Sequence, residues 1–147
     1  MSTGSVGTES AKDGAPVREG TPLVVDPEIL GLVRFDAAGL VAVVIQDVAA
    51  DGVLGVAYMN EESLRLTIET GRVWYWSRSR QELWRKGDTS GDVQYARELR
   101  VDCDGDALLL RVDQAGRGNC HTGEWSCFAR RIAEGPGAAS SPAAAHR

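Results

Sequence analysis

The sequence predicts an α+β domain made mainly of antiparallel β-strands, with one helix over about residues 60–70. Three features indicate this fold class. Short runs rich in β-branched residues alternate with turns that contain Asp and Gly. The pair Asp51-Gly52 is a strong signal for a two-residue β-hairpin. One segment combines a favourable N-cap, an apolar face of helical period and a terminal glycine.

The expected strands are short and follow one another closely. Residues 32–35 and 41–46 are predicted to form the first two strands, with a turn over 36–39 between them. The hairpin signal at Asp51-Gly52 leads into a third strand. This third strand is expected over residues 53–59. Later strands are expected over residues 73–77, 98–102 and 106–112, and the last two flank a tight Asp104-Gly105 corner.

The helix signals lie between residues 60 and 71. Asn60 is a favourable N-cap, and the two glutamates that follow it suit the positive first turn of a helix. Leu64, Thr67 and Ile68 repeat on one face, as expected for a helix that packs on a sheet. Gly71 is well placed to end the helix in a left-handed conformation.

The composition bounds the class of protein. A chain of 147 residues suits one domain, and its net charge of −5 argues against a general nucleic-acid or membrane-surface binder, because both need a basic footprint. No apolar run approaches the length of a membrane span, and residues 1–22 lack the hydrophobic segment of a secretory signal. We therefore expect a cytoplasmic protein, in which three cysteines are free thiols or metal ligands rather than disulfides.

The two ends of the chain differ in composition from the rest. Residues 1–22 and 134–147 contain few large apolar side chains, so we expect disordered tails around a folded domain over residues 23–133. His146 lies in the second tail and is given no chemical role. This leaves His121 as the histidine of the predicted domain.

The three cysteines are candidate zinc ligands. Sixteen residues separate Cys103 from Cys120 and six separate Cys120 from Cys127, which is not the paired spacing of zinc fingers. One interpretation is three small buried hydrophobic residues. The other is a zinc site in which three thiolates leave one tetrahedral position open, as in catalytic zinc sites. His121 could fill that position, which would make the site structural.

Three aspartates alternate around Cys103. Asp102, Asp104 and Asp106 resemble the start of a calcium loop, but its sixth position is Ala107 instead of glycine. A solvated acidic turn is one interpretation. Facing carboxylates repel, however, and a bound hard cation such as magnesium relieves that repulsion. In an extended chain, alternation places two aspartates on one face and the thiol on the other, which favours two different metals and hydrolytic chemistry.

A basic stretch provides candidate groups for phosphate. Arginine forks, hydroxyl groups and glycine-freed amides hold phosphate, although a solvated basic loop has the same composition. The tryptophans could stack on a base, although aromatic residues in strands are more often core residues. The candidate substrate contacts are Trp76, Ser77, Arg78, Ser79, Arg80, Trp84, Arg85, Lys86, Thr89 and Ser90.

Five motifs in order resemble one family. They are AYMNEE (57–62), YWSRSR (75–80), LWRKGDTSG (83–91), DCDGD (102–106) and CHTG followed by SCF (120–128). Together they resemble phosphoribosyl-AMP cyclohydrolase of histidine biosynthesis, in its single-activity form, from about residue 27 to 131. The resemblance implies that water adds at C6 of the adenine ring of phosphoribosyl-AMP and that the N1–C6 bond opens.

The resemblance also implies the cofactors and the assembly. Family enzymes are homodimers, here expected to be intertwined, with one zinc per subunit held by Cys103 of one chain and by Cys120 and Cys127 of the other. The three aspartates hold magnesium, and the basic stretch meets the two substrate phosphates. His121, next to a zinc ligand, is the candidate general acid/base, or a residue that only orients a ligand. The alternative function is a non-catalytic zinc module closed by the three cysteines and His121.

Overall fold

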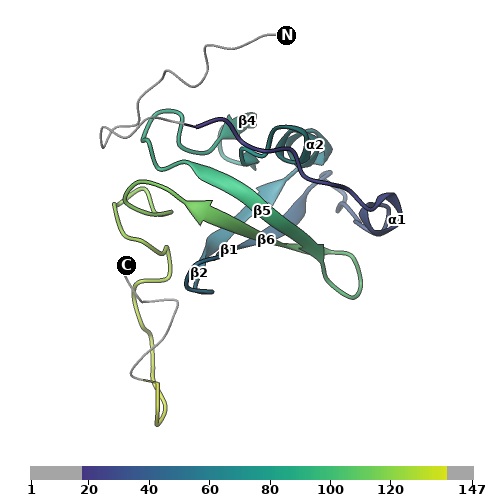
Figure 1. Cartoon of the computed structure of the whole chain (residues 1–147). Coiled ribbons are helices and arrows are strands. Elements are labelled where there is room, and N and C mark those ends of the chain that lie inside the picture. Colours follow the sequence, from purple (N-terminus) through teal and green to yellow (C-terminus); the bar gives the residue numbers. More distant parts are fainter. Residues whose placement is uncertain (1–17, 139–147) are drawn as a thin grey trace.

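The structure is a computed structural model that describes residues 18–138. Its elements follow one another through short connections, and the sheet lies at the centre of the molecule with the helix α2 and a small hairpin along one side (Figure 1). In chain order they are α1 (Pro27–Leu30), β1 (Val41–Asp47), β2 (Val53–Met59), α2 (Glu61–Thr70), β3 (Trp74–Ser77), β4 (Glu82–Arg85), β5 (Gln94–Val101) and β6 (Ala107–Gln114).

The main sheet has four strands in the order β2-β1-β6-β5. The pairs β1–β2 and β5–β6 are antiparallel, as the hairpin signals predict. The central pair β1–β6 is parallel, so the sheet is mixed, which the sequence analysis did not anticipate. Parallel pairing is possible here because the whole segment from β2 to β5 connects the two strands. The predicted mainly-β α+β fold with one long helix is otherwise confirmed.

The strands β3 and β4 form a separate two-stranded sheet. They pair from Trp74 opposite Arg85 to Ser77 opposite Glu82, and β3 packs against β2 and α2. The sequence predicts β3, whereas the residues of β4 fall within the basic stretch for which a loop is one interpretation. The strand β4 is short and partly exposed, so it lacks the strong apolar alternation that identifies a strand from sequence.

The helix α2 begins and ends at the predicted residues. The Asn60 side chain accepts a hydrogen bond from the Ser63 backbone amide at 2.8 Å, and the Ser63 hydroxyl accepts one from the Asn60 amide at 2.9 Å. Gly71 ends the helix at φ +74°, as predicted. A Cβ added at Gly71 would lie 2.2 Å from the backbone oxygen of Thr21, so only glycine fits there.

The predicted strand over residues 32–35 is wrong. A four-residue helix, α1, precedes this segment, with Asp26 as its N-cap and Pro27 as its first residue. The segment then crosses the β5–β6 turn instead of joining a sheet, and the Arg34 amide donates to the Gly105 carbonyl at 2.8 Å. The Arg34 amide therefore finds its hydrogen-bond partner outside any strand ladder. The composition of residues 32–35 alone was not enough to predict their conformation.

The core lies between the main sheet, α2 and the β3–β4 hairpin. Every second residue of β1 is buried, and β6 shows the same alternation over most of its length. The largest fully buried side chains include Tyr75, Ile45, Leu54, Met59 and Leu110. The two central strands are therefore fixed in register by their buried faces, and the turns at their ends are held in place.

The predicted tails lie mostly outside the described residues. Residues 1–17 and 139–147, and with them His146, are not described. Residues 18–22 contact the domain: the Arg18 amide donates to the Tyr95 hydroxyl at 2.9 Å, and Gly20 lies against the end of α2. Across residues 18–138, no helix has the length and apolar character needed to span a bilayer.

Candidate functional site

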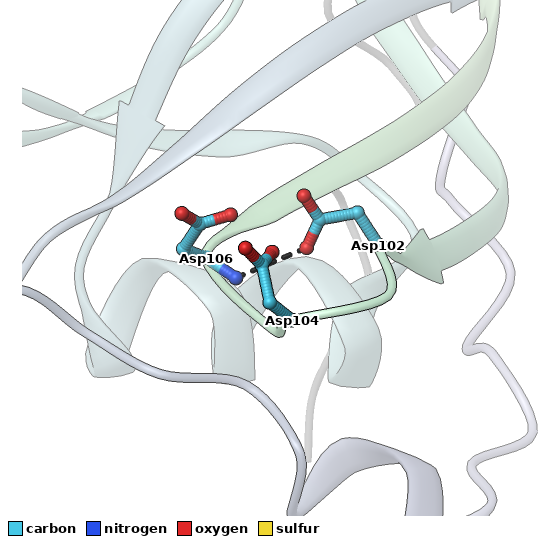
Figure 2. A group of neighbouring side chains, drawn as sticks. All are labelled: Asp102, Asp104 and Asp106. Carbon is cyan, nitrogen blue, oxygen red and sulfur yellow. Dashed lines mark hydrogen bonds between the residues drawn. The ribbon is translucent and has the colours of Figure 1, made fainter.

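The turn between β5 and β6 gathers the three aspartates (Figure 2). Oδ1 of Asp102 accepts hydrogen bonds from the backbone amides of Asp106 at 3.0 Å and Ala107 at 3.3 Å. Gly105 forms the corner at φ +84°, and a Cβ there would lie 2.3 Å from the Leu32 carbonyl oxygen. The turn is therefore closed by its own backbone and backed by the segment that precedes β1.

The aspartate carboxylates lie close enough to hold one cation. One oxygen from each of Asp102, Asp104 and Asp106 lies within 4.8 Å of the others, and all three residues are exposed. Among residues 18–138, no other group of three His, Cys, Asp or Glu ligand atoms meets this distance. Hydrogen bonds with its two neighbours, and then their negative charge, raise the pKa of Asp106. This repulsion is what a hard cation relieves.

Two of the cysteines lie together after β6. The Cys127 amide donates to the Leu54 carbonyl at 2.8 Å, and the Cys120 amide donates to the Glu124 carbonyl at 3.2 Å. Each sulfur also accepts a hydrogen bond: Cys120 Sγ from the Thr122 hydroxyl at 3.0 Å, and Cys127 Sγ from the side-chain amide of Asn119 at 3.1 Å. Both sulfurs thus face donors, as metal-binding thiolates do.

The two thiols have unequal acidity. Hydrogen bonds from the Thr122 side chain and backbone lower the pKa of Cys120. Burial raises the pKa of Cys127, and the negative charge of Cys120 raises it further. The two groups are therefore close enough to influence each other's proton, and a divalent cation between them would favour two thiolates.

Cys103 does not join this pair within one chain. It lies in the turn before β6, whereas a Cβ added at Gly55 would lie 3.3 Å from Cys127 Sγ. Gly55 is on β2, which is separated from β6 by β1. The row of paired residues that contains Gly55 runs across β1 and reaches β6 three residues after the first residue of that strand. These steps alone separate the two places by more than about 10 Å, while sulfurs that share a zinc lie about 4 Å apart.

The histidine next to the cysteine pair is exposed. His121 follows Cys120 directly, at the start of a turn in which the Gly123 amide donates to the Cys120 carbonyl. The alternative closed site needs Cys103, Cys120, His121 and Cys127 around one ion. In residues 18–138 of a single chain these four side chains do not form a group within ligand distance.

The basic stretch divides between the two ends of the β3–β4 hairpin. Ser79 and Arg80 lie in the turn with Arg78, whose guanidinium stacks on the Tyr58 ring with 3.9 Å to its centroid. At the other end Arg85 Nε donates to Asp88 Oδ1 at 2.7 Å. The remaining candidates are half-buried Trp76, Ser77 and Ser90, and exposed Trp84 and Thr89.

A surface cavity lies beside the aspartates. It has a volume of about 370 Å³ and is lined by Tyr58, Asp104, Asp106 and Arg34, among others. The guanidinium of Arg34 and the carboxylates of Asp36, Asp104 and Asp106 line this hollow, and Arg78 stacks on the ring of Tyr58 in its wall. Tyr58 was not among the predicted site residues, although it belongs to a motif that carried the resemblance.

Lys86 differs from the other basic side chains. It is 5% exposed, and its Nζ donates to the Asn119 carbonyl at 2.8 Å. Burial lowers its pKa, although the nearby acidic groups Asp92, Cys127 and Cys120 act in the opposite direction. Its ammonium therefore lies beside the cysteine pair instead of in solvent. Sequence reasoning missed Asn119, whose only signal was its position next to a candidate ligand.

The comparisons with known proteins agree with these motifs. The family model described as phosphoribosyl-AMP cyclohydrolase matches residues 55–129 of the chain. This range contains all six predicted metal ligands and His121. The chain belongs to the phosphoribosyl-AMP cyclohydrolase family. The resemblance stated from the sequence is confirmed.

Several curated relatives carry the family name. The phosphoribosyl-AMP cyclohydrolase of Bifidobacterium longum (strain DJO10A) is 61% identical over 104 residues, which cover 71% of this chain and 79% of the relative. That of Rhodopseudomonas palustris (strain TIE-1) is 49% identical over 128 residues, covering 87% and 83%. A histidine biosynthesis bifunctional protein HisIE of Thermosynechococcus vestitus is 56% identical over 111 residues, and the chain spans about half of its length, 52%.

Proposed function

We propose that this chain opens the adenine ring of phosphoribosyl-AMP by hydrolysis, with water adding at C6 and the N1–C6 bond breaking. The match of the family model over residues 55–129 carries the proposal. Family membership gives the chain phosphoribosyl-AMP cyclohydrolase activity, a hydrolase step of histidine biosynthesis. The product is the formimino-aminoimidazole carboxamide ribotide.

In this proposal the β5–β6 turn holds magnesium. Asp102, Asp104 and Asp106 offer oxygen ligands within 4.8 Å of one another, which suits a hard cation. Their exposure leaves room for the waters that magnesium retains. The cavity beside the turn would bring a substrate phosphate to the same cation, with Arg34 in its lining and Arg78 stacked on its Tyr58.

Zinc would be held by thiolates from two chains. Cys103 of one protomer would meet Cys120 and Cys127 of the partner subunit, one zinc per subunit, in an intertwined homodimer. The separation of Cys103 from the cysteine pair within one chain supports this arrangement, because zinc ligands must converge. Two hydrogen-bonded sulfurs and a buried ammonium nearby suit a negatively charged thiolate site.

Zinc, when bound, lowers the pKa of a coordinated water to about 7 and so supplies a nucleophile at neutral pH. The chain's own residues then manage the protons. His121 is exposed next to Cys120, where a ring nitrogen would accept the proton of the attacking water and return it to the departing ring nitrogen. The alternative, simpler role is that His121 only orients a ligand.

The remaining predicted residues would bind the substrate. Arg78 and Arg80 lie in the exposed β3–β4 turn and would meet one phosphate, with Ser77 and Ser79 as hydroxyl donors. Arg85, Thr89 and Ser90 lie at the other end of the hairpin and would meet the second phosphate or the ribose. Trp76 and Trp84 lie on opposite faces of the hairpin, so one of them would offer its ring face to the base. Lys86 is buried against the Asn119 carbonyl and would support that backbone instead of contacting the substrate.

A non-catalytic zinc module remains the rival function. It would close one site with the three cysteines and His121, and it would have no use for three clustered aspartates. The aspartate cluster favours the enzyme.

The deciding experiment is a spectrophotometric assay of the full chain with phosphoribosyl-AMP, paired with metal analysis. The proposal predicts ring opening that depends on both zinc and magnesium. A folded, zinc-loaded protein that leaves phosphoribosyl-AMP intact with magnesium present would support the module instead.

A further inference from the structure

Asn119 connects one cysteine of the pair to the interior of the fold. Its side-chain amide donates to Cys127 Sγ at 3.1 Å and to the Leu54 carbonyl at 3.0 Å. Its side-chain oxygen accepts a hydrogen bond from Gln94 Nε2 at 2.7 Å. All the polar atoms of this side chain are therefore used, and the direction of the donor toward sulfur is fixed by its other contacts.

The partner of Asn119 belongs to a buried polar network. Gln94 is fully buried and also donates to Gln114 Oε1 at 2.8 Å. Its own side-chain oxygen accepts a hydrogen bond from the buried Tyr75 hydroxyl. Because these groups are buried away from solvent, each of them holds its hydrogen-bond partner in one orientation. The chain of bonds runs from the core of the hairpin to the sulfur of Cys127.

Two further features shape the same place. Gly55 lies directly beneath the contact: a Cβ added there would lie 2.5 Å from Asn119 Nδ2 and 3.3 Å from Cys127 Sγ. The φ of Gly55 is not in the left-handed region, so its lack of a side chain serves space and not backbone conformation. In addition, Lys86 Nζ donates to the Asn119 carbonyl at 2.8 Å, which holds the backbone of the residue before Cys120.

We propose that Asn119 is a positioning residue for zinc. It sets the direction of the Cys127 sulfur, because its side chain is held by the hydrogen bond from Gln94 and fits into the space that Gly55 leaves open. Lys86 supports it from the backbone side and places a positive charge beside the thiolates. The proposal rests on the zinc site of the proposed function. It goes beyond that site because Asn119 is not itself a ligand, and hydrogen bonds to a metal ligand typically change metal affinity by about 10- to 100-fold.

The test replaces Asn119 by aspartate, which keeps the size of the side chain, replaces the donor to sulfur and to the Leu54 carbonyl by an acceptor, and adds a negative charge beside the thiolate. The zinc dissociation constant of the full chain is measured by chelator competition, at a temperature where circular dichroism shows the protein folded. We expect Asn119→Asp to raise this constant by about 10-fold or more. The cobalt-substituted protein should show a weaker sulfur-to-metal charge-transfer band. A merely structural residue would lower the melting temperature without changing either readout.

The chain supplies a matched control for this change. Asn60→Asp makes the same replacement at the N-cap of α2, where aspartate caps a helix as well as asparagine does. Zinc affinity of this variant should equal that of the wild type. An Asn119→Asp protein that is folded and binds zinc as tightly as the wild type would overturn the proposal.

A second variant decides the question if Asn119→Asp does not fold. Gly55→Ala keeps every hydrogen-bonding group and adds only a Cβ beneath the contact, so it should also weaken zinc binding by about 10-fold. Gly135→Ala, where a Cβ meets nothing within 4 Å, is its control. Unchanged zinc affinity in Gly55→Ala would overturn the proposal. A wild-type chain that binds no zinc through its thiols would instead remove the proposed function.

Discussion

Cys103 and Cys127 lie at different places around the same four-stranded sheet, Cys103 in the β5–β6 turn and Cys127 in the segment after β6, against Gly55 of β2. In Figure 1 the β5–β6 turn and the segment that follows β6 leave the sheet in opposite directions. A zinc ion bound by both residues therefore requires two chains. This relation ties the proposed chemistry to the proposed assembly, because a monomer would supply one ligand to one zinc site and two ligands to the other.

Each of the three cysteines should be needed for zinc. The variants Cys103→Ser, Cys120→Ser and Cys127→Ser replace a soft thiolate by a poor ligand, so zinc content and turnover should fall together. Metal analysis of the purified variants, alongside the activity assay, checks this. A Cys127→Ser protein with one zinc per chain and full turnover would rule out the assignment of the ligand.

Magnesium should be separable from zinc. Exposed carboxylates hold magnesium loosely, so brief EDTA treatment should remove activity, and added magnesium should restore it while zinc stays bound. Asp104→Asn should raise the magnesium concentration needed for half-maximal activity by about 10-fold or more. Glu61→Gln, which removes a carboxylate from the exposed face of α2, is the control. An unchanged magnesium requirement in Asp104→Asn would argue against the aspartate site.

His121→Ala should separate proton transfer from metal binding. If His121 moves a proton, turnover should fall by about 100-fold or more, while zinc content remains normal. His146→Ala, which changes the other histidine of the chain, should leave turnover unchanged. Loss of zinc from His121→Ala would make His121 a ligand and favour the closed structural site. Normal turnover would remove His121 from the mechanism.

Asp92 should make the protein sensitive to acid. Burial works to raise the pKa of Asp92, but hydrogen bonds and charge from Arg117 outweigh it and hold that pKa below its ordinary value. A carboxyl group with a depressed folded-state pKa stabilises the fold above its unfolded pKa, and this stabilisation is lost as the pH falls through the folded pKa. Asp92→Asn should therefore lower the free energy of unfolding at pH 7 by about 1–2 kcal/mol.

This difference between wild type and Asp92→Asn should shrink as the pH falls below about 4, because the carboxyl of the unfolded chain then takes up a proton while the folded carboxyl, with its lower pKa, does so only at more acidic pH. Urea denaturation of the metal-free proteins at several pH values measures it. Asp113→Asn, whose carboxylate is more exposed and pairs with exposed arginines, should show a smaller effect at pH 7. A difference that stays constant down to pH 3 would contradict the role of Arg117.

Much of the fold could be predicted where local signals dominate. The helix from Asn60 to Gly71 is specified by residues next to one another and is confirmed. The hairpin expected at Asp51-Gly52 does join β1 to β2, but its loop spans residues 48–52 instead of two residues. The parallel pairing of β1 with β6 joins residues more than 60 positions apart, and no local sequence signal predicts it. The strand expected over residues 32–35 failed for the same reason, since only contact with a distant turn decides its conformation.

The same distinction between local signals and distant contacts applies to the candidate site. The aspartates lie within five residues, so alternation and a tight corner were enough to predict that they meet. The distance of Cys103 from Cys127 depends on strand order, which the sequence did not reveal, although the family resemblance implied ligands from two chains. The burial of Lys86 against Asn119 was also unpredictable, because a lysine in a basic stretch has the same local pattern whether it faces solvent or a distant carbonyl.

Mixing two inactive variants tests the shared zinc site most directly. Purified Cys103→Ser and Cys127→Ser proteins are combined, subunit exchange is verified by mass, and turnover of phosphoribosyl-AMP is measured. In a heterodimer one site receives both defects and the other receives none. Random exchange should therefore restore about a quarter of the wild-type activity, since half of the dimers carry one intact site of two. No activity after verified exchange would contradict a zinc site built from Cys103 of one chain and Cys127 of the other.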